Sequence, residues 1–173
     1  MQSLAKHFRE RPMLGSRNLK RVLVVEDDPD QTLMLEEFLE SYFYRVTTAS
    51  NGVEGLKAIM DADFDVILCD VVMPKMAGDM FYHAIQRVKP QLCERFIFLT
   101  AHQENTRLRD FLNQVSGKVL MKPFHLDDLL EMILLLFREL EDPTTELTSP
   151  EDGAARMLPP IVLRVGGSGL TAL

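Results

Sequence analysis

Short apolar runs alternate along this chain with longer stretches in which apolar residues recur every three or four positions. The short runs are rich in valine, isoleucine and leucine without a helical period, which is typical of strands buried on both faces. The longer stretches have the spacing of helices that pack one side against a core. Because the two patterns alternate with short connections, they predict βαβ units and a parallel sheet. The pattern extends from residue 18 to residue 140 of a 173-residue chain.

Each apolar run predicts one strand, and a helix is expected after each strand. The predicted strands cover residues 21–25, 45–49, 64–70, 95–99 and 118–121. The predicted helices follow Asp28-Pro29, Asn51-Gly52 and Gly78, and then begin near Glu104 and at Leu126. Asp28 suits the N-cap of the first helix, with Pro29 as its first residue. The expected fold is therefore α/β, a doubly wound five-stranded parallel sheet with five helices.

The two ends of the chain differ in composition from this alternating region. Residues 1–17 show no sustained period, and we expect a polar N-terminal extension there. Residues 141–173 are rich in proline and glycine, which favours a disordered tail. Residues 161–165 are the exception, because they are apolar enough to add an edge strand or to bind a partner. We therefore expect one domain over residues 18–140, with an extension on either side.

Charge, hydropathy and cysteine content exclude several classes of protein. A net charge of −7 argues against a nucleic-acid-binding surface, which needs a concentrated basic face. The sequence has no apolar stretch long enough for a membrane span, and charged residues interrupt the N-terminus too early for a secretory signal. Cys69 and Cys93 have the sequence context of free thiols. These features predict a cytoplasmic protein that binds neither nucleic acid nor membrane.

Four of the five predicted strands end in residues with distinctive chemistry. These residues are Glu26 and Asp27, then Asp70, then Thr100, then Lys122. Right-handed crossovers bring the carboxyl ends of parallel strands to one edge of a sheet, so these side chains should lie together. Any one of them could be a helix cap or a surface residue, but all of them together indicate a site.

The residue types at these strand ends suit phosphoryl transfer. Three neighbouring carboxylates repel one another unless a cation lies between them, and oxygen ligands without His or Cys favour Mg²⁺. A carboxylate such as that of Asp70 is an adequate nucleophile towards an activated phosphoryl group, and the product is an acyl phosphate. The Lys122 ammonium would neutralise charge on the phosphoryl group, and the Thr100 hydroxyl would donate to one of its oxygens.

These motifs resemble those of the receiver domains of response regulators in two-component signalling, either stand-alone (CheY-like) or excised from a hybrid kinase. The matching pieces are Val24-Val25-Glu26-Asp27-Asp28, Leu68-Cys69-Asp70-Val71-Val72-Met73-Pro74, Gly78, Leu99-Thr100-Ala101 and Lys122-Pro123-Phe124. The resemblance implies a flavodoxin-like sheet with strand order 2-1-3-4-5. It also implies that Asp70 accepts a phosphoryl group from the phosphohistidine of a sensor histidine kinase or a histidine phosphotransfer protein.

The same resemblance implies a set of ligands for Mg²⁺. Asp27 and Asp70 would bind the ion directly, together with the backbone carbonyl of Val72. Glu26 would act mainly through water. The role implied for the whole chain is that of a phosphoprotein switch, which relays a signal through protein–protein contacts and is not a turnover enzyme.

Two positions depart from the family pattern. Three residues before the lysine, members usually carry an aromatic residue that moves inward when the threonine engages the phosphoryl group, whereas this chain has Val119. Two residues after the acceptor stands Val72, whose apolar side chain cannot orient an attacking water, so we expect a long-lived phosphoryl state. The Lys122–Pro123 peptide bond, in contrast, is expected to be cis as in the family.

Two other functions fit parts of the pattern. A receiver-like adaptor would bind its partners independently of phosphorylation, and Val119 is compatible with this alternative. An aspartyl-phosphate hydrolase of the haloacid-dehalogenase type would need an acid two residues after its nucleophile, where this chain has Val72. The hydrolase is therefore the weaker alternative.

The last predicted helix carries more apolar residues than one buried face needs. Met132, Leu135 and Leu136 lie on or near the side opposite the core stripe of this helix. A helix with two apolar sides commonly contacts another protein or a second copy of itself. We therefore expect a homodimer through this helix, unless the C-terminal tail folds over it.

Overall fold

The structure is a computed structural model of the chain. It describes residues 19–101, 106–141, 162–166 and 169–172, the last two ranges as backbone only. The strands of the main sheet are β1 (Arg21–Val25), β2 (Arg45–Ala49), β3 (Val66–Asp70), β4 (Phe96–Thr100) and β5 (Lys118–Met121). The helices are α2 (Pro29–Ser41), α3 (Gly52–Asp61), α4 (Gly78–Val88), α5 (Thr106–Gln114) and α6 (Leu126–Glu141), and a 3₁₀ turn, η1 (Pro90–Arg95), precedes β4.

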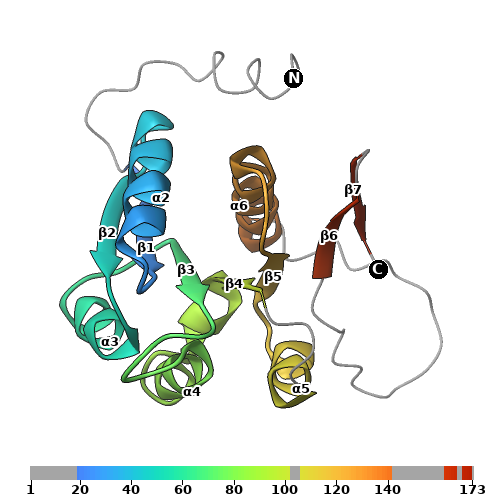
Figure 1. The fold of residues 1–173 in the computed structure, drawn as a ribbon. Coiled ribbons are helices and arrows are strands. Elements are labelled where there is room, and N and C mark those ends of the chain that lie inside the picture. The colour runs from blue at the N-terminus through green and yellow to red at the C-terminus, as the bar shows by residue number, and fades with distance from the viewer. Residues whose placement is uncertain (1–18, 102–105, 142–161, 167–168, 173) are drawn as a thin grey trace.

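These five strands form a parallel sheet in the order β2-β1-β3-β4-β5, which confirms the predicted doubly wound fold. Helices cover both faces of the sheet, with α2 and α6 on one side and α3, α4 and α5 on the other (Figure 1). Two apolar cores result, one between each layer of helices and the sheet. The strands β3 and β4 are buried along their whole length because each lies between two neighbouring strands and two layers of helices.

Local sequence signals start the first two helices at the predicted places. The Asp28 carboxylate accepts hydrogen bonds from the backbone amides of Asp30 at 2.9 Å and Gln31 at 3.2 Å, so it caps α2 as expected. The Asn51 side chain caps α3 in the same way, through the amides of Val53 and Glu54. Both caps fix the direction in which the chain leaves a strand at the carboxyl edge of the sheet.

Two further strands extend the sheet beyond β5. The strand β6 (Val162–Gly166) pairs in parallel with β5, and β7 (Gly169–Ala172) pairs with β6 in antiparallel orientation. These strands lie within the tail for which disorder is predicted, and β6 overlaps the apolar residues 161–165. The bounds of the domain and the disorder of the tail stay predictions. The predicted N-terminal extension and residues 142–161 of the tail lie outside the described residues.

The interpretation of α6 as a helix with a second, exposed apolar side is wrong. Met132 and Leu136 are buried in the core under α2 and α6, and Leu135 is half-buried. The helix crosses the sheet closely enough to bury a wide arc of its surface. The apolar pattern of α6 therefore gives no support to the predicted homodimer through this helix.

Among the described residues, the structure contains no helix of the length and hydropathy that a membrane span requires.

Candidate functional site

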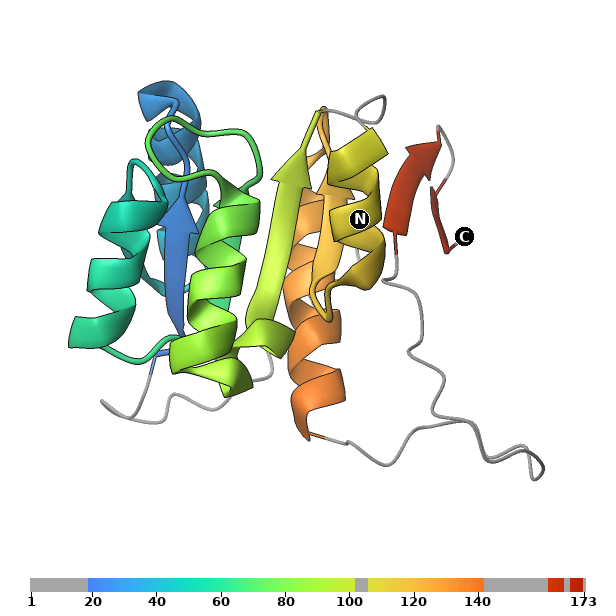
Figure 2. The same ribbon diagram turned by 90° about the horizontal axis from the view of Figure 1, so that it is seen from below.

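Strand register brings the predicted site residues to one edge of the sheet. Val25 of β1 pairs with Cys69 of β3, so Glu26 and Asp70 follow side by side. Thr100 ends β4 opposite Met121 of β5, and the next residue is the predicted lysine. The strands finish at the same edge in Figure 2. The structure thus brings together the functional side chains that lie at four separate strand ends in the sequence.

Lys122 connects two of the three acidic residues. Its Nζ donates to Asp70 Oδ2 at 2.6 Å and to Glu26 Oε2 at 2.8 Å. The Glu26 residue is only 2 % exposed, so its carboxylate depends on this ammonium for compensation. The Lys122–Pro123 peptide bond is cis, as expected.

Burial and pairing oppose each other in setting the pKa values of these groups. Burial raises the pKa of Glu26, and the neighbouring charge of Asp70 raises it further, while the hydrogen bond from Lys122 acts in the opposite direction. Burial disfavours the charged form of Lys122, but its hydrogen bonds to Asp70 and Glu26 outweigh burial and raise its pKa. The lysine therefore stays protonated at neutral pH, as a charge-neutralising group requires.

The carboxylate of Asp70 is held at both oxygens. The backbone amide of Val72 donates to Oδ1 at 2.9 Å, while Lys122 contacts Oδ2. Two hydrogen bonds fix the orientation of the side chain at the mouth of the site. Val72 itself is 50 % exposed, so it is not buried beside the carboxylate.

The third acid, Asp27, completes a group suited to a divalent cation. Glu26, Asp27 and Asp70 each offer a carboxylate oxygen, and these three oxygens lie within 4.8 Å of one another. Opposite ligand atoms of a Mg²⁺ ion are about 4.2 Å apart. Small movements of the three side chains would therefore allow all three oxygens to bind one ion. The hard oxygen donors and the surplus negative charge both fit Mg²⁺.

Thr100 and Val119 lie deeper than the acids. Thr100 is fully buried at the end of β4, and its carbonyl accepts from the Lys122 amide at 2.8 Å, which helps to position the lysine. Val119 is buried in the core shared by α3, α4 and α5, and its register partner is Phe98. A valine side chain therefore lies in this core at the position where the family resemblance leads us to expect an aromatic residue.

One supporting residue escaped the sequence analysis. The Thr32 hydroxyl lies 3.2 Å from the backbone carbonyl of Glu26 and 2.9 Å from that of Asp28, so it ties the first turn of α2 to the acidic loop. A threonine four residues after a helix cap is a weak signal, because such hydroxyls often donate to a carbonyl of the preceding turn. A pocket lined by Asp79 and Arg107 was also missed, since its walls come from the loop after β3 and from the separate helices α4 and α5.

The fold and the site together define a flavodoxin-like domain that carries an acidic, lysine-containing site at the carboxyl edge of its sheet. The chain belongs to the family of response regulator receiver domains, whose sequence profile matches residues 22–134. Receiver domains take phosphoryl groups from histidine kinases and serve as signalling switches in two-component systems.

Similar proteins agree with this assignment. The response regulator receiver protein CpdR of Brucella abortus is 34 % identical over 115 residues, which cover 66 % of this chain and 94 % of that protein. A CheY-like receiver domain from Methanospirillum hungatei superposes with a TM-score of 0.67 at 28 % identity, over 73 % of this chain and 99 % of that one. TrrA of Thermotoga maritima, solved in complex with Mg²⁺ and BeF, has a TM-score of 0.58 at 29 % identity, over 68 % and 99 %.

Other relatives are much longer than the matched region. The chain spans 30 % of the length of a transcriptional regulatory protein and 7 % of that of a hybrid histidine kinase. The receiver unit therefore occurs both alone and joined to other domains among the relatives.

Proposed function

We propose that this chain is a phosphorylation-dependent signalling switch in which Asp70 accepts a phosphoryl group. The observation that carries the proposal is the position of the Asp70 carboxylate, which Lys122 and the Val72 amide hold at the edge of the sheet beside two further acids. The donor would be the phosphohistidine of a sensor histidine kinase or of a histidine phosphotransfer protein. The two buried free thiols support a cytoplasmic location.

The transfer needs one bond to form and one to break. A carboxylate oxygen of Asp70 attacks the phosphorus atom, the phosphorus–nitrogen bond of phosphohistidine breaks, and the departing imidazole takes up a proton from solvent. Lys122 stays protonated and lies close enough to stabilise negative charge on the phosphoryl oxygens. The Thr100 hydroxyl supplies a further donor at the end of the adjacent strand.

The acidic group would hold Mg²⁺ through Asp27 and Asp70, with the carbonyl of Val72 as a further ligand and Glu26 acting mainly through water. When bound, the ion supplies neutralisation of the charge on the transferring phosphoryl group. The protein's own contribution is to hold the nucleophile, lysine and threonine in place on rigid strand ends.

Phosphorylation by a small-molecule donor tests the proposal without knowledge of the kinase. We expect incubation with acetyl phosphate and Mg²⁺ to add one phosphoryl group, measured as a mass increase by intact-protein mass spectrometry. The Asp70→Asn variant should show no such increase, because its amide is a poor nucleophile. Chelation of the metal by EDTA should suppress the increase in the unaltered protein.

A matched control removes an acid elsewhere in the domain. Asp65 precedes the same strand, β3, at its opposite end and bonds Lys20 and the Arg21 amide, so Asp65→Asn should be phosphorylated like the unaltered protein. An equal mass increase in Asp70→Asn would refute the assignment of the acceptor. A folded chain that takes up no phosphoryl group would instead favour the adaptor that acts independently of phosphorylation.

A further inference from the structure

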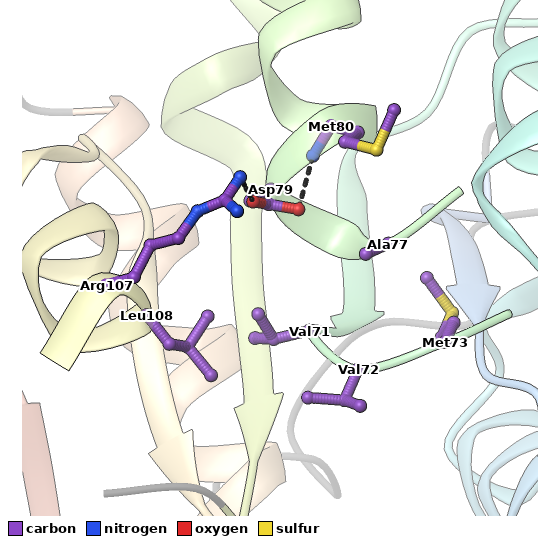
Figure 3. A pocket seen from close by; sticks show the side chains of 8 residues that line it. All are labelled: Val71, Val72, Met73, Ala77, Asp79, Met80, Arg107 and Leu108. Atoms are coloured by element: carbon purple, nitrogen blue, oxygen red, sulfur yellow. Dashed lines mark hydrogen bonds and ion pairs between the residues drawn. The ribbon is translucent and has the colours of Figure 1, made fainter. Parts of the chain in front are cut away.

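A pocket of about 280 Å³ lies next to the proposed acceptor, between the loop after β3 and the first turns of α4 and α5 (Figure 3). Most of its lining is apolar, and the apolar side chains are those of Val71, Val72, Met73, Ala77, Met80 and Leu108. Val71, Met73 and Leu108 are buried and form the floor. Val72 and Met80 are 50 % and 54 % exposed, so they form an apolar mouth that is open to solvent.

The size and shape of the pocket favour a protein segment as its occupant. Pockets for drug-sized ligands begin at about 300 Å³ and enclose most of the ligand. This pocket is smaller and open at Val72 and Met80, which suits one or two protruding side chains of a larger partner. Methionine at the mouth and in the floor allows the walls to adapt to the side chain that enters.

The rim carries charge that specifies the partner further. Arg107 and Asp79 face each other across the rim, with their side chains 3.5 Å apart (Figure 3). The Arg107 side chain is 87 % exposed, whereas that of Asp79 is 21 % exposed and accepts from the Met80 amide at 2.8 Å. The partner therefore meets mainly the guanidinium, which binds carboxylates well.

The pocket is also connected to the proposed phosphorylation site. Val71 and Val72 directly follow Asp70, and the Val72 amide bonds its carboxylate. The opposite wall belongs to the first turn of α5, the helix that comes next in the chain after β4 and Thr100. Both walls of the pocket are therefore continuous in the chain with strand ends that carry proposed site residues.

We propose that this pocket docks an amphipathic helix of a partner protein, which inserts apolar side chains spaced at i and i+4 and places a carboxylate against Arg107. This spacing places both apolar side chains on one face of the partner helix, so that one or both can enter the pocket. This surface also offers a route for the signal that does not require an aromatic residue at Val119.

A displayed library of 16-residue helical peptides, with varied apolar residues at i and i+4 and varied charged flanks, tests the docking site. Selection on the full chain should enrich Leu, Met or Phe at both positions together with a flanking Asp or Glu. The enriched peptide should bind the Met80→Lys variant at least tenfold more weakly. The control variant Met60→Lys, at a 61 % exposed position on α3, should bind it within twofold of the unaltered protein.

Charge reversal provides a second, independent measurement. Arg107→Glu should weaken the peptide with an acidic flank, and a peptide with a basic flank should bind this variant better than it binds the unaltered protein. An absence of enriched peptides, equal binding to Met80→Lys, or indifference to the charge of residue 107 would each overturn the docking site.

Coupling between the pocket and Asp70, unlike the docking site itself, rests on the proposed function. We expect Mg²⁺ with beryllofluoride, a phosphoryl mimic, to change the affinity of the enriched peptide at least fivefold. A mimic that changes the amide spectrum around Asp70 without changing affinity would overturn the coupling. If beryllofluoride leaves the amide spectrum of the protein unchanged, that result would count against the proposed function. The docking site would still be supported if the Met80→Lys variant binds the peptide more weakly.

Discussion

At the scale of single residues, the acids at the sheet edge outnumber the cation that compensates them. Glu26, Asp27 and Asp70 bring three carboxylates together, and Lys122 contacts two of them. The surplus charge costs free energy in the isolated domain and favours the entry of a divalent cation. The hydrogen bonds from Lys122 and the Val72 amide hold the Asp70 carboxylate in one orientation.

The residue two positions after Asp70 is expected to set the lifetime of the phosphorylated state. Val72 is half exposed beside the carboxylate but offers no polar atom from its side chain to an attacking water. A Val72→Gln variant should lose its phosphoryl group on the order of tenfold faster, because an amide can orient water for hydrolysis. The loss of the phosphorylated mass over time after removal of acetyl phosphate measures this rate.

Val53 provides the matched control, because it is 51 % exposed at the start of α3 and contributes no contact to Asp70 among those described. The Val53→Gln variant should dephosphorylate at the rate of the unaltered protein. Equal lifetimes for Val72→Gln and the unaltered protein would show that this position does not control hydrolysis.

Single residues show clearly what the sequence could predict about the site. The types and strand-end positions of Glu26, Asp70 and Lys122 follow from local patterns and from the rule that parallel strands end together. The pairing of Lys122 with Glu26 does not, because these residues are 96 positions apart and the choice between neighbouring acids depends on side-chain geometry. Local patterns could not predict the pocket beside Asp70 either, because two of its lining residues, Arg107 and Leu108, come from α5, far along the chain.

At the scale of elements, the loop between β3 and α4 is held close to the acceptor by a glycine. A Cβ atom at Gly78 would lie 2.6 Å from the backbone oxygen of Asp70 and 2.9 Å from Val71 Cα. The Gly78 amide also donates to the Val71 carbonyl at 3.0 Å. The start of α4 therefore packs directly on the backbone of Asp70 and Val71.

Substitution of this glycine should disturb both stability and phosphorylation. Gly78→Ala is expected to lower the free energy of unfolding by about 1–3 kcal/mol, because backbone atoms cannot yield as side chains do. Urea denaturation measures this change, and phosphorylation by acetyl phosphate should slow in parallel as Asp70 shifts.

Gly55 offers a matched comparison within the same fold. A Cβ atom there would meet the Phe81 ring at 3.0 Å, and the higher helix propensity of alanine offsets part of this crowding. Gly55→Ala should therefore cost less than Gly78→Ala and leave phosphorylation unchanged. The reverse order of stabilities would show that close approach at Gly78 is not what limits this loop.

The elements themselves were predictable where burial dominates the pattern. The bounds of β1 and β5 agree with the apolar runs, because a strand buried on both faces leaves a continuous signature. The bounds of β2 also agree with the prediction, although most of this strand is exposed or half-buried. The turn η1 was missed, since its sequence contains a Lys-Pro signal but no period. The exposure of α6 was misjudged because Met132 and Leu136 face a core whose width only the packed layers determine.

At the scale of the whole molecule, the family fold ends with β5 and α6, and the chain then returns to the sheet. The strand β6 joins β5 through two residue pairs, Val119 with Val162 and Leu120 with Leu163. Its partner β7 then forms the outer edge of a seven-stranded sheet (Figure 1). An edge strand attached through so few pairs adds little to a sheet that is complete without it.

Removal of residues 142–173 should therefore leave the domain folded. We expect the free energy of unfolding to fall by less than about 2 kcal/mol, because β6 joins β5 through only two residue pairs. Hydrogen exchange at the amides of β5 should become faster. A full-length Leu163→Pro variant should show the same faster exchange, because proline cannot donate to the ladder.

Two other results of these experiments would move the boundary of the domain or remove the role of β6. Loss of cooperative unfolding after truncation would show that β6 and β7 belong to the core of the domain. Unchanged exchange in β5, in both the truncated chain and Leu163→Pro, would show that β6 does not protect this edge in solution.

The contact between Lys122 and Glu26 also has a consequence for the folding of the chain during its synthesis. A chain emerging from the ribosome presents Glu26 and Asp70 long before Lys122 has been synthesised. Asp70 then lacks the ammonium group that contacts its carboxylate, and the sheet lacks its fifth parallel strand. Under the proposed function, we therefore expect a chain to accept a phosphoryl group only after β5 and Lys122 have joined the fold, so unfinished chains would not signal.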